Sequence, residues 1–176
     1  MHENITLDSS GVVPAESVRR IRRLVTGIDQ SGRSVFVEDG EATHQQVVAN
    51  TPTFVVTDLW CHDTVPVDNS RPADDGLSGG VPLSPPLGGS VFRTVEFPPD
   101  SHWLGRADAP SDQVHATPSL DYATVISGQI WAVLDDGERL MGPGDVLIQR
   151  GTRHAWSNRG DRPSLVAFVL IGGLTQ

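Results

Sequence analysis

Short runs of alternating apolar and polar residues, separated by turns, make up most of this chain. In residues 90–97 (SVFRTVEF), a period of two places Val91, Arg93 and Val95 on one face of a predicted strand. Residues 164–173 (SLVAFVLIGG) are almost continuously apolar, as expected of a strand that is buried on both faces. No stretch shows strong helical periodicity, and turns rich in glycine and proline separate the runs. The pattern predicts an all-β barrel or sandwich.

The first third of the chain predicts additional strands. Residues 22–40 alternate on both sides of a DQSGR turn and predict a β-hairpin. Residues 52–63 (PTFVVTDLWCHD) predict a further strand. We therefore expect residues 1–20 to form an N-terminal arm and residues 21–176 to form one barrel domain.

One long segment, residues 62–89, interrupts the strands with a run rich in proline, glycine, aspartate and serine. Such a composition offers little apolar surface with which to anchor a loop. Long loops within compact domains often serve function. We expect a mobile loop near the mouth of a cavity.

Composition and charge exclude several classes of protein. A chain of 176 residues is long enough for one domain with a core of its own. The net charge of −9 argues against binding to a nucleic-acid backbone, which needs clustered basic residues. No apolar run approaches the ~20 residues of a membrane span. The first ten residues lack the order of a signal peptide, so we expect a cytoplasmic protein that binds neither nucleic acid nor membrane.

The chemistry is concentrated in residues 115–158. His115, Asp121 and His154 lie near the ends of separate predicted strands, and these side-chain types bind first-row transition metals. A barrel could bring the three side chains into one pocket. The alternative is a structural role, in which the histidines hydrogen-bond to loops and Asp121 accepts from backbone amides.

Residues 115–158 resemble a cupin domain. The first cupin motif is matched by a histidine, an acidic residue six positions later and a glycine seven positions after that. The second is matched by a Gly-Asp turn, a glycine corner, a histidine and an asparagine. The matching residues are His115, Asp121, Gly128, Gly144, Asp145, Gly151, His154 and Asn158. Over most of its length the chain is also similar to small single-domain bacterial cupins, which share its RRLVTG opening, its TDLW strand and its H-x-T-x-x-x-DY motif.

The resemblance implies a fold and a metal. The fold is a single-domain cupin barrel, a double-stranded β-helix or jelly roll, with extra strands at the N-terminus. Metal-binding cupins hold iron, manganese, nickel or zinc with three histidines and one carboxylate. This chain departs from that pattern, because Thr117 replaces one histidine, Asp121 replaces a glutamate and Gln149 replaces the corner proline. Two histidines and a carboxylate still suffice for a ferrous or zinc site, and His102 is a further candidate ligand.

The function implied is a metal-dependent enzyme that acts on a small organic molecule, either an oxygenase or a lyase, isomerase or cyclase. In this hypothesis His115, Asp121 and His154 are both the metal ligands and the catalytic residues. Four further residues are expected in the pocket: Thr117, Trp131, Gln149 and Trp156. The alternative is a metal-free or non-catalytic cupin that binds a small ligand. The family also implies a homodimer, in which N-terminal strands contact the partner's sheet.

Overall fold

The computed structural model describes residues 11–70, 72–78, 80–106 and 113–174. The first ten residues of the expected N-terminal arm lie outside this part of the chain. The described residues form eleven strands and a single 3-10 helix of three residues, η1. None of their helices is long and apolar enough to cross a membrane. The elements are β1 (Arg22–Ile28), β2 (Ser34–Glu41), β3 (Gln45–Val48), β4 (Thr51–His62), β5 (Ser90–Phe97), η1 (Asp100–His102), β6 (Ser119–Ser127), β7 (Ile130–Leu134), β8 (Gly137–Met141), β9 (Val146–Arg150), β10 (His154–Ser157) and β11 (Ser164–Gly172).

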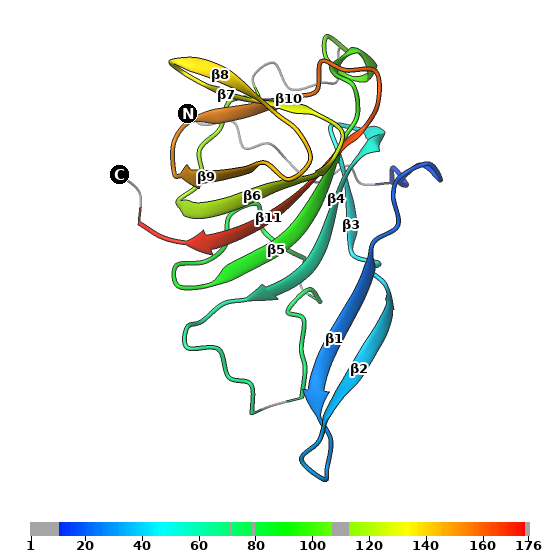
Figure 1. Ribbon diagram of the computed structural model, residues 1–176, viewed down its shortest axis with the longest axis vertical. Helices are drawn as coiled ribbons and strands as arrows, with labels where there is room; N and C mark the ends of the chain where they lie inside the picture. The colour runs from blue at the N-terminus through cyan, green and yellow to red at the C-terminus, as the bar shows by residue number, and fades with distance from the viewer. Residues whose placement is uncertain (1–10, 71, 79, 107–112, 175–176) are drawn as a thin grey trace.

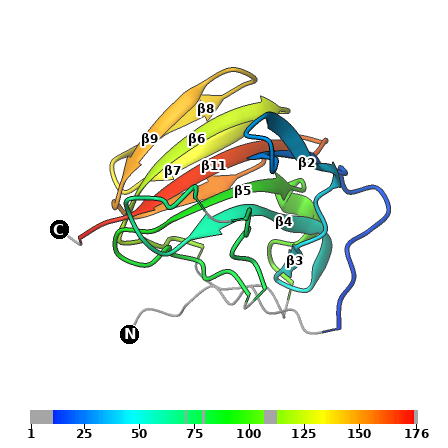
Figure 2. The same ribbon diagram turned by 90° about the horizontal axis from the view of Figure 1, so that it is seen from below.

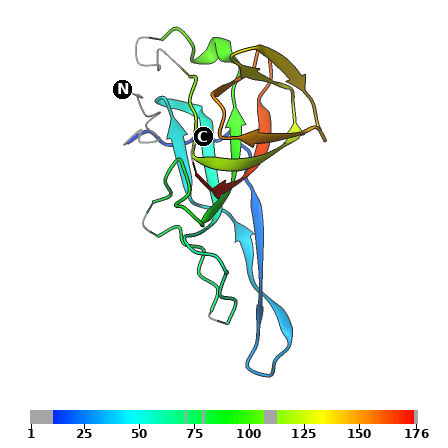
Figure 3. The same ribbon diagram turned by 90° about the vertical axis from the view of Figure 1, so that its left-hand side faces the viewer.

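Two antiparallel sheets face each other and form a barrel (Figures 1 and 3). The larger sheet has the order β3-β4-β5-β11-β6-β9, and the smaller has the order β10-β7-β8. Strand β11 lies at the centre of the larger sheet, between β5 and β6, which explains its nearly continuous apolar sequence. The prediction of a single-domain all-β barrel of the jelly-roll type is confirmed.

The core lies between the two sheets and is built from one face of each strand. Along β6 the burial alternates residue by residue, so that Asp121, Ala123 and Val125 point inward while Tyr122 and its neighbours on the opposite face point outward. The same period orients β5 and β11. A polar side chain on an inward position of these strands therefore lies in the barrel interior.

The predicted hairpin is formed by β1 and β2, which among the described strands pair only with each other (Figure 1). It projects away from the barrel, as the view in Figure 3 also shows. Its exposed apolar side chains are Leu24, Ile28, Phe36 and Val37. A homodimer contact would cover such a surface, and the homodimer stays a prediction.

The segment between β4 and β5 has no helix or strand among its described residues, yet it is anchored in the core. Leu77 is 2% exposed and Val81 is also buried in the main apolar cluster. The backbone of this segment passes so close to β11 that a Cβ added to Gly172 would clash with the carbonyl oxygen of Pro86. Figure 2 shows the segment running below β4 and β5. The expectation of a loop with little apolar anchorage is wrong, because leucine and valine are scattered among its turn-forming residues.

Candidate active site

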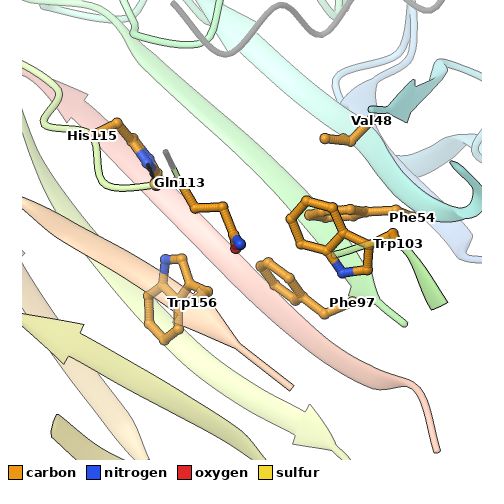
Figure 4. Close-up of a pocket in the computed structure, with 7 residues that line it drawn as sticks. All are labelled: Val48, Phe54, Phe97, Trp103, Gln113, His115 and Trp156. Atoms are coloured by element: carbon orange, nitrogen blue, oxygen red, sulfur yellow. Dashed lines mark hydrogen bonds between the residues drawn. The ribbon is translucent and has the colours of Figure 1, made fainter. Parts of the chain in front are cut away.

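A cavity of about 110 Å³ lies in the barrel interior, and a smaller one of about 60 Å³ adjoins it. The two share most of the smaller cavity's lining, and the smaller one adds Trp103 and Gln113 (Figure 4). The wall of the larger cavity is mainly apolar. Its apolar residues are Val48, Phe54, Val56, Leu83, Val95, Phe97, Trp156, Phe168 and Leu170. Its polar residues are Arg93, His115, Thr117, Asp121 and His154.

A continuous aromatic wall forms one side of both cavities. Phe54 contacts Trp103 edge-on, with ring centroids 4.9 Å apart, and contacts Phe97 at 5.3 Å. Phe97 in turn packs against Trp156 at 6.3 Å, and Trp156 packs edge-on against Phe168 at 5.4 Å. Figure 4 shows the side-chain amide of Gln113 reaching into the space between these rings. Such a wall presents large apolar surfaces to a bound molecule.

His115 and His154 form a pair at the polar end of the cavity. The residues are joined by an antiparallel backbone bridge, and their ring centroids are 4.4 Å apart. Each ring has its Nδ1 atom 3.0 Å from a backbone carbonyl oxygen, that of Gln113 for His115 and that of Thr152 for His154. A carbonyl oxygen can only accept, so each Nδ1 carries the proton and donates it. Nε2 is left as the nitrogen available to a ligand.

Burial, together with the neighbouring His115, lowers the pKa of His154 from 6.5 to about 4. The His154 side chain is therefore neutral at neutral pH, and its Nε2 is a proton acceptor. A neutral ring with a free acceptor nitrogen can accept a hydrogen bond or a proton, and the low pKa makes it a weak base.

The corner that fixes His154 is itself held by Gln149. The side-chain amide of Gln149 donates to the carbonyl oxygen of Thr152 at 2.9 Å and also to its hydroxyl oxygen. That carbonyl is the one that accepts from Nδ1 of His154. Gln149 is buried, but it does not belong to the lining of either cavity. Its role in the structure is to shape the loop that orients the histidine.

Asp121 lies on the inward face of β6 and is 5% exposed. Its Oδ2 atom accepts a long hydrogen bond of 3.5 Å from the hydroxyl of Thr117, which in turn accepts from Ser119 at 2.8 Å. Its Oδ1 atom is buried and has no hydrogen-bond partner among the residues that the structure describes. Burial raises the pKa of this carboxyl, and the hydroxyls of Ser119 and Thr117 partly oppose that effect. Asp121 is therefore a carboxylate held in an apolar cavity without full compensation.

A second buried carboxylate was missed by the reading of the sequence. Asp58 on β4 forms an ion pair with Arg93 on β5, with Oδ1 of Asp58 2.9 Å from Nε of Arg93, and its Oδ2 atom accepts from Gln46 at 2.7 Å. The guanidinium of Arg93 also donates to the carbonyl oxygens of Pro82 and Leu83, at 2.9 and 3.4 Å. The signal was present in the sequence, since Arg93 shares its strand face with Val91 and Val95.

The residues present do not fit the predicted three-ligand metal site as they lie. The chemistry of the donors is suitable, because two histidines offer Nε2 and a buried carboxylate offers a free oxygen. Within the described ranges, however, no three His, Cys, Asp or Glu side chains come close enough together to hold a metal ion. The metal stays a prediction.

The structure places the remaining predicted residues as follows. Thr117 and Trp156 line the larger cavity. Trp131 on β7 lies elsewhere, with the guanidinium of Arg159 4.8 Å from its ring centroid. His102 is exposed on η1 and lines neither cavity.

The chain is similar to several fungal proteins over nearly its full length. It is 31% identical to a cupin-domain-containing oxidoreductase of Hypocrea virens, over 95% of this chain and 85% of that protein. It is 36% identical to phomopsin biosynthesis cluster protein D of Diaporthe leptostromiformis, over 90% of this chain and 88% of that protein. A cupin-domain-containing oxidoreductase of Neurospora crassa is 30% identical to this chain, over 90% of this chain and 78% of that protein. No protein-family model matches the chain.

Solved structures give weaker similarities. An ethanolamine utilization protein of Salmonella typhimurium aligns with a TM-score of 0.44 and 10% identity, over 88% of this chain and 98% of that one. The cupin domain of a transcriptional regulator of Enterobacter cloacae aligns with a TM-score of 0.41 and 18% identity, over 68% of this chain and 96% of that one. The assignment of the family therefore depends on the relatives in sequence.

On the basis of its similarity in sequence to the fungal proteins, the chain belongs to the cupin family. The resemblance drawn from the two motifs is confirmed at the level of the superfamily. The relatives named above are fungal, so the expected restriction to bacterial cupins is not supported.

Proposed function

We propose that this protein is a cupin enzyme of the oxidoreductase class that transforms a small organic molecule in a biosynthetic pathway. The observation that carries the proposal is the pair of oriented histidines next to a buried, incompletely bonded carboxylate in an apolar cavity. Buried groups of this kind cost stability, and their concentration in one cavity is typical of active sites. The relatives that are named oxidoreductases, and the one named for a biosynthesis cluster, support the reaction class and the pathway setting.

The residues divide the work of such a reaction. Nε2 of His154 accepts a proton from the bound molecule, because burial keeps this ring neutral and Thr152 fixes its tautomer. The ring of His115, whose centroid lies 4.4 Å from that of His154, also adjoins the reacting group. Asp121 orients the molecule through Oδ1, and the aromatic wall excludes water from the reacting face. We assign only binding, orientation and proton transfer to these side chains.

In a more specific form of this proposal the enzyme depends on a transition metal. The alternative to the proposal as a whole is a metal-free protein that binds a ligand without converting it. Metal analysis of the purified protein separates a metal-dependent enzyme from a metal-independent one. One transition-metal ion per chain, lost in His154→Ala, would support metal dependence. The alternative is favoured if a ligand binds in the cavity of the protein as purified and is never converted.

Turnover is best tested with a small-molecule library of alcohols, aldehydes and ketones, in air and under argon, followed by mass spectrometry. We expect at least one compound to be oxidised by the native protein in air and to stay unchanged under argon, because dioxygen is the only electron acceptor supplied. His154→Gln and Asp121→Asn should each lower that turnover about 100-fold or more, as loss of a general base or an orienting group does. His102→Gln is the matched control, because His102 is an exposed histidine outside both cavities. A loss of activity in the control equal to that in His154→Gln would contradict the proposal.

A further inference from the structure

The unpartnered oxygen of Asp121 shows what kind of group the cavity is built to receive. A buried carboxylate oxygen normally accepts two or more hydrogen bonds, and leaving it unbonded is unfavourable. Oδ1 of Asp121 has none, although Oδ2 is approached by Thr117. Because Asp121 lines the larger cavity, a molecule bound in the cavity is placed to supply the missing donor.

The charges around the cavity argue against an acid as that molecule. Arg93 is the only arginine or lysine among the described lining residues, and it is already occupied. Its Nε atom is paired with Asp58, and its other two nitrogens donate to the carbonyls of Pro82 and Leu83. A carboxylate or phosphate entering the cavity would meet the Asp121 carboxylate without a cation to compensate it. An ammonium would have to leave water for a mainly apolar wall that already includes Arg93. The donor is therefore carried by an uncharged molecule.

The volume indicates how much of that molecule the barrel can surround. The larger cavity measures about 110 Å³, and the smaller one shares most of its lining with it. An apolar protein cavity of roughly 150 Å³ holds one benzene ring. The space next to Asp121 is therefore of the order of a single six-membered ring or a chain of similar bulk.

We infer that the cavity binds a small, uncharged alcohol, with its hydroxyl donating to Oδ1 of Asp121 and its apolar body against Trp156, Phe168 and Phe97. This inference deepens the proposed function by naming the class of its substrate, and it rests on that proposal for the identity of the site. Polar selectivity comes from Asp121 and apolar selectivity comes from the aromatic wall. The two contributions can be measured separately.

Binding of four probes to the purified protein tests the inference by titration calorimetry. Benzyl alcohol supplies the ring and the hydroxyl. Ethylbenzene replaces that hydroxyl by a methyl group of nearly the same size. Benzoate carries an anion, and benzylamine carries a cation at neutral pH.

We expect benzyl alcohol to bind about tenfold or more tightly than ethylbenzene, since a site that hydrogen-bonds a hydroxyl discriminates against its absence. Benzoate should bind more weakly than benzyl alcohol by a similar factor or more. Equal binding of ethylbenzene and benzyl alcohol overturns the inference, and so does tighter binding of benzoate or benzylamine. These comparisons use the native protein and do not depend on a variant that folds.

Two variants then assign the discrimination to a residue. Asp121→Leu keeps the approximate shape of the side chain and removes the acceptor, so the preference for benzyl alcohol over ethylbenzene should disappear. Tyr122→Phe is the control, because Tyr122 adjoins Asp121 on the outward face of β6 and should leave the preference unchanged. A preference that survives in Asp121→Leu overturns the assignment.

The experiment distinguishes failure of this inference from failure of the proposed function. Binding is measured without turnover, so a protein that prefers benzyl alcohol and never converts an alcohol refutes the enzyme and leaves the inference intact. Conversion of library compounds together with no hydroxyl preference refutes the inference and leaves the enzyme intact.

Discussion

Asp58 and Asp121 are both buried carboxylates in the same barrel, and burial raises the pKa of each. Asp58 has an arginine on one oxygen and a glutamine amide on the other. Asp121 has a long hydrogen bond on one oxygen and nothing on the other. Both face the interior, so burial alone does not distinguish a structural acid from a functional one.

What distinguishes the two is the completeness of their hydrogen bonding. In the Asp58–Arg93 pair each carboxylate oxygen and each guanidinium nitrogen has a partner, and through Arg93 the pair holds the backbone of the segment between β4 and β5. Its contribution is to the fold. The incomplete hydrogen bonding of the buried Asp121 carboxylate lowers the stability of the fold. Groups that persist despite such a loss of stability are often functional.

The largest expected effect is on stability at Asp58. Asp58→Ala leaves the guanidinium of Arg93 buried without its ion-pair partner, and we expect it to lower the free energy of unfolding by about 3–5 kcal/mol. Asp121→Ala should lower it by less than about 1 kcal/mol or raise it, because little hydrogen bonding is lost and an incompletely bonded carboxylate is no longer buried. Urea denaturation of the two variants measures the difference. Equal destabilisation would remove the distinction drawn between them.

The next effect is on the pH dependence of the free energy of unfolding, through His154 in the cavity. The pKa of His154 falls from 6.5 to about 4 on folding, so the native state binds this proton less readily than the unfolded state. The contribution that the neutral His154 ring makes to the free energy of unfolding is fully present above pH 6.5. It is lost as the pH falls toward 4, by about 3 kcal/mol in total. His154→Gln should lose less stability than the native protein over this window. The raised pKa of Asp121 acts in the opposite sense, so the comparison is made with that residue intact.

A smaller effect is expected at Gln149, which acts on the site through Thr152. Gln149→Leu removes the donors that hold the Thr152 corner and should cost about 1–2 kcal/mol of stability. It should also shift the Nδ1 proton resonance of His154, which a purely structural role would leave in place. Thr152→Ser is the matched variant, since it keeps both the carbonyl and the hydroxyl. An unchanged resonance in Gln149→Leu would exclude a positioning role.

The smallest effect is expected at the surface. Arg159 and Glu138 form a two-pronged ion pair, with nitrogen–oxygen distances of 2.7 and 2.6 Å, between exposed side chains. Water screens this pair, so Glu138→Ala should leave the unfolding midpoint within experimental error. A loss comparable to that of Asp58→Ala would mean that geometry, rather than burial, determines the cost.

Much of the fold could be predicted from the sequence, because local periodicity determines it. The alternation in residues 90–97 and the apolar run in residues 164–173 correspond to β5 and β11. The hairpin of β1 and β2 was visible from its turn. The short strand β3 was missed, because four residues are too few to establish a period. The anchoring of Leu77 was missed because the surrounding proline and glycine residues concealed it.

The candidate site could be predicted only in part. The cupin motifs identified His115, Asp121 and His154, and the two histidines do pair across a backbone bridge. Whether three side chains converge depends on distances that motifs do not encode. The pairing of Asp58 with Arg93 depends on the strand register, which the sequence of either strand alone does not determine.

Leu83 lies in the segment between β4 and β5, yet it forms part of the cavity wall. A residue on a central strand has hydrogen-bonded neighbours on two sides, whereas Leu83 belongs to no strand and its carbonyl oxygen, like that of Pro82, accepts from Arg93. Those bonds involve carbonyl oxygens and are indifferent to the side chain. Over evolutionary time the cavity can therefore acquire a new shape by substitution at this position while the barrel stays the same, which is one physical route from a single ancestral scaffold to enzymes with different substrates.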